Sequence, residues 1–235
     1  LTFFLMHAVP GGPFDAMTAA TAQMIPVELV ENMEELYGLD KPVWQQYGIF
    51  LKNALQGDFG YSYYASGRTI NELISEHWPN SIQIGVLTLA FSSVVGLGLG
   101  IFSAMNPGRW PDYLGTGVSL FCMTVPSFVF AKLMQYVVAV KLGWLPTSGW
   151  EGFSEPKYWV LPVLANSLGP ILTLQRYTRS AISDVMRSNY VRTARAKGLS
   201  ASKVTLIHIF KNALTPVVTV AGPMTASLIT GSIFI

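Results

Sequence analysis

Apolar residues in this chain gather in four long runs instead of alternating with polar residues. The clearest run covers residues 82–105 and is interrupted only by small or weakly polar side chains. A helix needs about 20 apolar residues to cross a bilayer, and this run is long enough. Three further runs, at 113–140, 159–181 and 213–235, have a similar character. The pattern therefore predicts an all-α protein whose main part is a polytopic transmembrane helical bundle.

Residues 10–79 are more polar and contain the start and stop signals of short helices. One helix is expected over 26–37, because it begins with Pro and is followed by Gly38. A second helix is expected to follow Pro42 and to end at Gly57. The segment is therefore interpreted as a small folded insertion rather than a linker.

The two ends of this insertion give further expectations. Thr69 and Glu72 have the spacing of a capping box, which predicts a third helix from that point. The apolar residues 1–9 are too short to cross a bilayer and are expected to be the end of a truncated first transmembrane helix. The predicted organisation is therefore this helix end, an extracytoplasmic insertion at 10–79 and a transmembrane domain at 80–235.

The distribution of charge predicts which loops face the cytoplasm. Eight of the fifteen Lys and Arg residues lie within 176–211, where Asp184 is the only acid, whereas 10–79 holds nine acids and three cations. Cytoplasmic loops of membrane proteins are enriched in Lys and Arg. Three predicted crossings separate the two segments, so they fall on opposite sides of the membrane. The basic loop 182–211 and the turn at Arg109 are expected in the cytoplasm, with 10–79 on the outer side of the membrane.

Composition supports a membrane protein and argues against several other classes. Hydrophobic residues make up 51% of the chain and charged residues 12%, with a mean hydropathy of +0.40, which is too apolar for an ordinary soluble domain. The cations lie between apolar runs, so membrane lipid is an expected partner and nucleic acid is not. Cys122 is the only cysteine and the three histidines are scattered, so no metal site is predicted. The sequence has no Gly-x-x-x-x-Gly-Lys-Ser/Thr loop, so neither an ATP site nor an enzymatic activity is expected in it.

The order of residues inside the basic loop predicts a compact elbow. Asn189 is expected to cap a short helix that runs to Lys197. Gly198 then ends that helix in the left-handed conformation, and Ser200 caps a second one. Two short helices that meet at a glycine make a projection able to enter a groove on a soluble partner. Charge alone predicts only orientation, so this residue order is what suggests a docking element.

The elbow resembles the cytoplasmic signature of the membrane subunits of ATP-binding cassette (ABC) importers of the oligopeptide and dipeptide permease type. The peptide-permease variant, Tyr-x-Arg-Thr-Ala-Arg-Ala-Lys-Gly-Leu, reads without a gap from Tyr190 to Leu199. Gly198 takes the place of the signature's glycine, while residues 192–194 and 208–211 stand where other members have Glu-Ala-Ala and Ile-x-Leu-Pro. Similar stretches at 10–13, 38–42, 57–60 and 208–216 extend the resemblance over essentially the whole chain.

This resemblance implies the type I importer permease fold and a set of partners. The partners are a second, homologous permease subunit in a heterodimer, two ATP-binding subunits that hold ATP and Mg, and an extracytoplasmic substrate-binding protein. Gly12 departs from the family, which often has Asp there, and the family continues beyond Ile235, so the chain is expected to lack both its beginning and its end. The implied ATPase-coupling residues are Tyr190, Arg192, Thr193, Ala194, Arg195, Ala196, Lys197, Gly198, Leu199 and Ser200.

The expected function is to form half of the translocation pathway for oligopeptides across the cytoplasmic membrane. Residues 145–150 look more like the oligopeptide branch of the family. The same importer class carrying dipeptides, glutathione or nickel complexes is the alternative. A gradient-driven carrier or channel, or a membrane scaffold, is more distant.

Lys132 and Pro126 are candidate pathway residues. Lys132 is the one charge well inside a predicted span, and a charge in the membrane is costly enough to suggest a partner or a substrate path. The alternative is that its long side chain reaches the membrane surface. Pro126 is a candidate because prolines kink helices beside cavities.

Overall fold

The computed structural model describes residues 2–8, 38, 41–60, 62, 68–149 and 151–230. These residues are mostly helical and contain no β-sheet, in agreement with the predicted all-α class. The chain divides into two compact units, residues 1–77 and 78–235.

In the first unit, a short helix α1 (Thr2–Ala8) contacts helix α4 (Val43–Leu55). Nε2 of His7 lies 2.9 Å from Oε1 of Gln46, and the rings of Phe3 and Tyr47 pack at a centroid distance of 5.2 Å. Helix α4 starts directly after Pro42, as expected from the sequence. Gly57, two residues beyond its end, has a positive φ of 76°, so the predicted stop is also confirmed. The helix predicted over 26–37 lies outside the described residues.

Helix α5 (Ile70–Met105) begins at the predicted capping box. The backbone N–H of Glu72 donates to Oγ1 of Thr69, and the backbone N–H of Thr69 donates to Oε2 of Glu72, each at 3.1 Å. The helix ends at the predicted residue 105 but starts 12 residues before the predicted span at 82 and continues through Pro79. The apolar run therefore marks only the later part of a longer helix.

A stripe of small residues on α5 lets neighbouring helices approach closely, as is common in membrane proteins. A Cβ built on Gly96 would lie 2.8 Å from Cβ of Leu174, which belongs to helix α8 (Pro156–Met186). A Cβ on Gly85 would lie 2.5 Å from the carbonyl oxygen of Leu228, in helix α11 (Lys211–Thr230). The buried residues of this stripe are Gly85, Thr88, Ser92, Gly96, Gly100, Ser103 and Ala104.

The span predicted at 113–140 is not one continuous helix. Helix α6 (Trp110–Thr124) ends at Val125, and helix α7 (Ser127–Met134) continues into the π-helix η1 (Gln135–Lys141) at an angle of 97°. Pro126, which lies inside the predicted span, accounts for the bend in two ways. It has no N–H to donate to α6, and its ring drives the preceding Val125 into an extended conformation, with φ −90° and ψ 115°.

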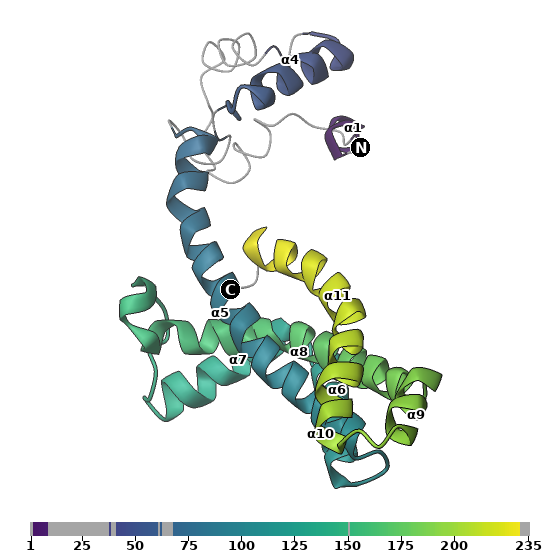
Figure 1. The fold of residues 1–235 in the computed structure, drawn as a ribbon. Coiled ribbons are helices and arrows are strands. Elements are labelled where there is room, and N and C mark those ends of the chain that lie inside the picture. Colours follow the sequence, from purple (N-terminus) through teal and green to yellow (C-terminus); the bar gives the residue numbers. More distant parts are fainter. Residues whose placement is uncertain are drawn as a thin grey trace. The chain divides into compact units, whose positions relative to one another are not determined.

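Helix α8 is the central helix of the second unit. Helices α5, α6, α7 and α11 all pack against it, and Figure 1 shows α5 and α11 crossing it. It remains helical through Pro162 and Pro170, as the sequence analysis expected. The loop before it contains a short 3-10 turn, η2 (Gly152–Ser154). The ten buried residues of α8 make it the main support for the rest of this unit.

After α8 the chain forms the elbow and returns along the bundle. The elements are α9 (Asn189–Ala196), α10 (Ala201–Lys203), the π-helix η3 (Val204–Phe210) and then α11. Their buried side chains join the end of α8 and one residue of α5 in a single hydrophobic cluster. Its buried members are Ala104, Leu174, Ala181, Ile182, Val191, Ala194, Val204, Ile209, Ala213 and Val217.

Two helical stretches among the described residues are long and apolar enough to cross a membrane, namely Ile70–Met105 and Ala201–Thr230. The bent pair of α6 with α7 and η1 is a third if it counts as one span. Helix α8 contains the predicted span 159–181 but is not among them, since polar residues such as Gln175 and Arg176 interrupt it. Its surrounding helices shield much of it, which is where a membrane protein tolerates such residues. The span through α8 stays a prediction.

Candidate functional site

The elbow is anchored to the bundle by one face of α9. Val191 is 0% exposed and Ala194 is 5% exposed, and both belong to the hydrophobic cluster that includes Ile182 of α8. Their spacing of three residues puts the two side chains on the same side of the helix. Helix α9 packs against η3, and through this cluster the elbow forms part of the bundle core.

The turn of the elbow has the backbone geometry that the sequence predicts. Gly198 has a φ of +76°, and its N–H donates to the carbonyl oxygen of Arg195 at 3.0 Å. Ser200 stands at the N-cap of α10, although its side chain makes no capping hydrogen bond. The predicted cap at Asn189 is wrong by one residue: Ser188 holds the N-cap position, because its extended backbone, with φ −68° and ψ 151°, precedes the first helical residue.

The outward face of the elbow is cationic. The side chains of Arg192, Arg195 and Lys197 are exposed, and none of them forms a salt bridge with a described residue. Tyr190 is also exposed, at 46%, so an aromatic ring lies among the cations. A face of this kind can receive acidic and apolar groups of a partner without first breaking contacts within the chain. The remaining predicted coupling residues are exposed or half-buried, namely Thr193, Ala196, Leu199 and Ser200.

An ion pair that the sequence analysis did not identify ties α6 to α8. Asp112, which is buried, accepts two hydrogen bonds from Arg179: Nε to Oδ1 at 2.6 Å and Nη2 to Oδ2 at 2.9 Å. Asp112 Oδ2 also accepts the backbone N–H of Gly108 at 3.0 Å. One carboxylate therefore holds both the α5–α6 turn and α8. The available signal was that Asp112 is the only acid between Glu76 and Glu151.

A buried polar contact lies further along the same helix pair, about one turn away on α8 and two turns away on α6. Oγ of Ser119 donates to Oε1 of Gln175 at 2.5 Å, and Gln175 is 1% exposed. Nε2 of Gln175 has no hydrogen-bond partner among the described residues. Both residues line an open groove of about 780 Å³ between α6 and α8, whose mouth includes Arg176 and Tyr177.

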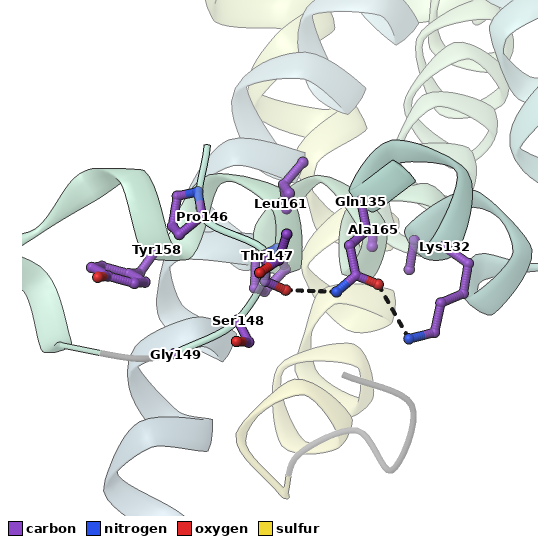
Figure 2. Close-up of a pocket in the computed structure, with 11 residues that line it drawn as sticks. Lys132, Gln135, Pro146, Thr147, Ser148, Gly149, Tyr158, Leu161 and Ala165 are labelled. Carbon is purple, nitrogen blue, oxygen red and sulfur yellow. Dashed lines mark hydrogen bonds between the residues drawn. The ribbon is translucent and has the colours of Figure 1, made fainter. Parts of the chain in front are cut away.

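Lys132 lines a different cavity, of about 310 Å³, between α7, the loop before α8 and the first turns of α8. Its Nζ donates to Oε1 of Gln135 at 3.2 Å, and Nε2 of Gln135 donates to the carbonyl oxygen of Thr147 at 2.6 Å. Figure 2 shows Gln135 between the other two residues. Pro126, the other candidate pathway residue, begins the same short helix but does not line this cavity.

The elbow and the Lys132 cavity lie toward opposite ends of α8. Leu161 near the start of α8 lines the cavity, and the elbow begins just after α8 ends at Met186. At 1.5 Å per residue the two points are about 38 Å apart along the helix axis. The predicted coupling residues thus come together on the elbow, whereas Lys132 belongs to a separate site. Among the described residues, no group of three or more His, Cys, Asp and Glu side chains is placed to hold a metal ion.

Comparison with known proteins finds peptide transport permeases that match the full length of the chain. The oligopeptide transport system permease protein OppB of Haemophilus influenzae is 39% identical over 235 residues, which is all of this chain and 74% of that protein. OppB of Salmonella typhimurium is 37% identical over 236 residues, covering 100% of this chain and 75% of that protein. The dipeptide transport system permease protein DppB of Bacillus subtilis is 34% identical over 235 residues, again over 100% of this chain and 74% of the relative.

One protein family matches residues 96–235. This part of the chain contains α8, the elbow and the Lys132 cavity. That family is described as the binding-protein-dependent transport system inner membrane component. With the match covering more than half of the chain and relatives above 30% identity over all of it, the chain belongs to this family of membrane transport permeases.

Proposed function

We propose that this chain is the permease subunit of an ATP-driven importer and forms half of a translocation path for oligopeptides. The observation that carries the proposal is the match of the whole chain to oligopeptide permeases at 35–39% identity. The elbow sequence 190–199 also supports it, because it carries the peptide-permease signature while the sequence has no nucleotide-binding loop of its own. ATP and Mg are then bound by two separate subunits, and the chain itself is not an enzyme.

The elbow is the proposed contact with those ATP-binding subunits. Exposed cations on α9 face the partner, while Val191 and Ala194 fix the helix to the core. A push on the elbow therefore moves α8 and the helices packed on it as one body, since a packed core shifts between arrangements rather than deforming continuously. Closing of the ATP-binding subunits would draw the elbows of the two permease subunits together, so it would close the path on the cytoplasmic side and open it toward the outside, as alternating access requires.

The remaining assembly follows from the same proposal. A second, homologous permease subunit completes the path, and a substrate-binding protein outside the membrane delivers the peptide. The basic loop 182–211 faces the cytoplasm and 10–79 lies outside, because Lys and Arg are enriched in cytoplasmic loops. The transmembrane domain is proposed to occupy residues 80–235.

Dipeptides are the second candidate substrate, since dipeptide permeases of Lactococcus lactis and Bacillus subtilis are 36% and 34% identical to this chain. Uptake by the reconstituted importer distinguishes the two. The complete complex in proteoliposomes, with its binding protein and ATP, is expected to take up a labelled tetrapeptide. Unlabelled peptides of four or five residues should compete with it strongly. Stronger competition by dipeptides, glutathione or a nickel complex would reject the oligopeptide assignment.

A further inference from the structure

The cavity beside Lys132 carries positive charge. Among the lining residues that the structure describes, Lys132 is the only one with a charged side chain, and none is Asp or Glu. Glu155, an acid in the loop before α8, is already paired with Lys157 at 3.2 Å. The cavity therefore favours a negatively charged group.

The ammonium of Lys132 is oriented but not saturated. A lysine has three N–H donors, and the structure shows one of them used, on Oε1 of Gln135. Gln135 is in turn fixed by its bond to the carbonyl oxygen of Thr147, so its oxygen points at Lys132 (Figure 2). An anion that enters the cavity thus meets a cation that Gln135 holds in place and that has further N–H donors for hydrogen bonds.

The backbone at this site is unusual. Gln135 is the first residue of the π-helix η1, and π-helical turns inside helices are frequent at functional sites. On the opposite wall, Gly149 has a φ of +107°, and a Cβ there would lie 3.0 Å from the ring of Tyr158. A larger residue at this position would therefore push the Tyr158 ring.

Apart from Ser148, the other lining residues that the structure describes are apolar. They include Leu161, Pro162 and Ala165 of α8, and the volume of about 310 Å³ is at the small end of the range for ligand pockets. Such a space holds about one amino-acid residue with its end group. A lysine supplies one compact charge with rotatable donors, which can bind a single oxygen of a carboxylate or a phosphate.

We propose that this cavity binds the C-terminal residue of a peptide, with its free carboxylate on Lys132 and its side chain against the wall formed by α8. The proposal rests on the proposed function, since it names the part of the transported peptide that this chain recognises. Gln135 is a positioning residue that holds the lysine. A phosphate of a lipid headgroup carries similar negative charge, so the test must separate it from a carboxylate.

Transport by the complete importer in proteoliposomes tests the proposal with two matched peptides. One tetrapeptide has a free C-terminal carboxylate, and the other has the same sequence ending in an amide. The same binding protein is used with every variant. A change in the acid-to-amide uptake ratio between variants is therefore caused by the substitution in this chain. Lys132→Gln should lower that ratio about tenfold, as expected for loss of a charge-assisted hydrogen bond. The matched control is Lys141→Gln, an exposed lysine of η1 that does not line the cavity and should leave the ratio unchanged.

Two results would overturn the proposal. Either the acid-to-amide ratio is unchanged in Lys132→Gln, as when uptake of both peptides falls equally, or the effect of Lys132→Gln disappears when anionic lipid is omitted from the vesicles. The last result would assign Lys132 to a lipid phosphate.

A second measurement needs no variant and no transport. The rate at which Lys132 is acetylated in the wild-type complex is followed by mass spectrometry. N-acetyl-leucine, which has a free carboxylate, should slow this reaction, and its amide should not. Acetylation of Lys141 should be unaffected by either compound. Equal acetylation of Lys132 with both compounds would count against the site. If protection is seen but no peptide is imported, the proposed function fails and the site stands.

Discussion

Arg179 on α8 holds Asp112 on α6 through two parallel hydrogen bonds, with Nε 2.6 Å from Oδ1 and Nη2 2.9 Å from Oδ2. Asp112 also accepts the backbone N–H of Gly108, so the pair fixes the turn between α5 and α6 as well. The pair lies on the part of α8 that leads into the elbow. It is therefore placed to keep α6 and α8 moving together when the elbow is pushed.

Arg179→Ala should destabilise the complex because it leaves the buried carboxylate of Asp112 with one hydrogen-bond donor in place of three. The expected loss is about 1–3 kcal/mol of unfolding free energy, visible as a lower thermal midpoint in detergent. Arg179→Lys should lie between Ala and wild type, since lysine cannot form the parallel pair. Arg176→Ala is the control, because Arg176 is exposed and in no salt bridge with a described residue. Equal midpoints for the two Ala variants would show that the pair does not matter for stability.

Gly100→Ala should weaken the packing of α5 on α8. A Cβ at this position would lie 2.6 Å from Cβ of Thr178 and 2.9 Å from the carbonyl oxygen of Gln175. Overpacking of this kind costs about 1–3 kcal/mol. Gly98→Ala is a matched control in the same helix, because it would meet nothing within 4 Å and gains helix propensity of up to roughly 1 kcal/mol. Thermal midpoints of the two variants should move in opposite directions, and a drop in both would refute the close approach.

Gly198→Val should disturb the elbow without any clash. Nothing lies within 4 Å of a Cβ there, so the penalty is the left-handed backbone, about 1–2 kcal/mol. Co-purification of the ATP-binding subunits is expected to fall, with Gly198→Asn less affected because Asn tolerates this conformation. Undiminished binding by the Val variant would argue that the docking surface lies elsewhere.

Charge reversal on α9 tests the outward face separately from its fold. Arg192→Glu with Arg195→Glu leaves Val191 and Ala194 in place, so the helix should still pack while losing its cationic surface. We expect at least a tenfold weaker affinity for the ATP-binding subunits and a changed salt dependence. Lys141→Glu, on the separate π-helix η1, should bind as wild type does. Similar binding by all three proteins would mean that the cations of α9 do not contact the partner.

The sequence predicted the features that depend on a few neighbouring residues. Pro42 and Gly57 bracket α4, Thr69 and Glu72 form the capping box, and Gly198 is left-handed, because each signal acts within one or two helical turns. The error of one residue at Asn189 has the same local origin, since Ser188 and Asn189 are both acceptable caps.

Features that depend on distant parts of the chain were not predicted. Pro126 indicated a kink in the span 113–140, but the size of the bend, 97°, could not be predicted because prolines in membrane helices bend them by very different amounts. Asp112 and Arg179 are 67 residues apart, and nothing in the sequence says that α6 and α8 are neighbours. The charge of Lys132 was visible in the sequence, and Gln135 is its neighbour about one helical turn on, but Thr147 joins them only once the loop folds back onto α7.

The central claim is that ATP hydrolysed by partner subunits drives peptide across the membrane through this chain. It is tested most directly by uptake of a labelled tetrapeptide into proteoliposomes that contain the complete complex, with the binding protein outside and ATP inside. The account predicts accumulation of peptide only with hydrolysable ATP on the side of the elbow, and none with a non-hydrolysable analogue. Accumulation driven by an ion gradient without ATP, or by this chain without the ATP-binding subunits, would contradict it.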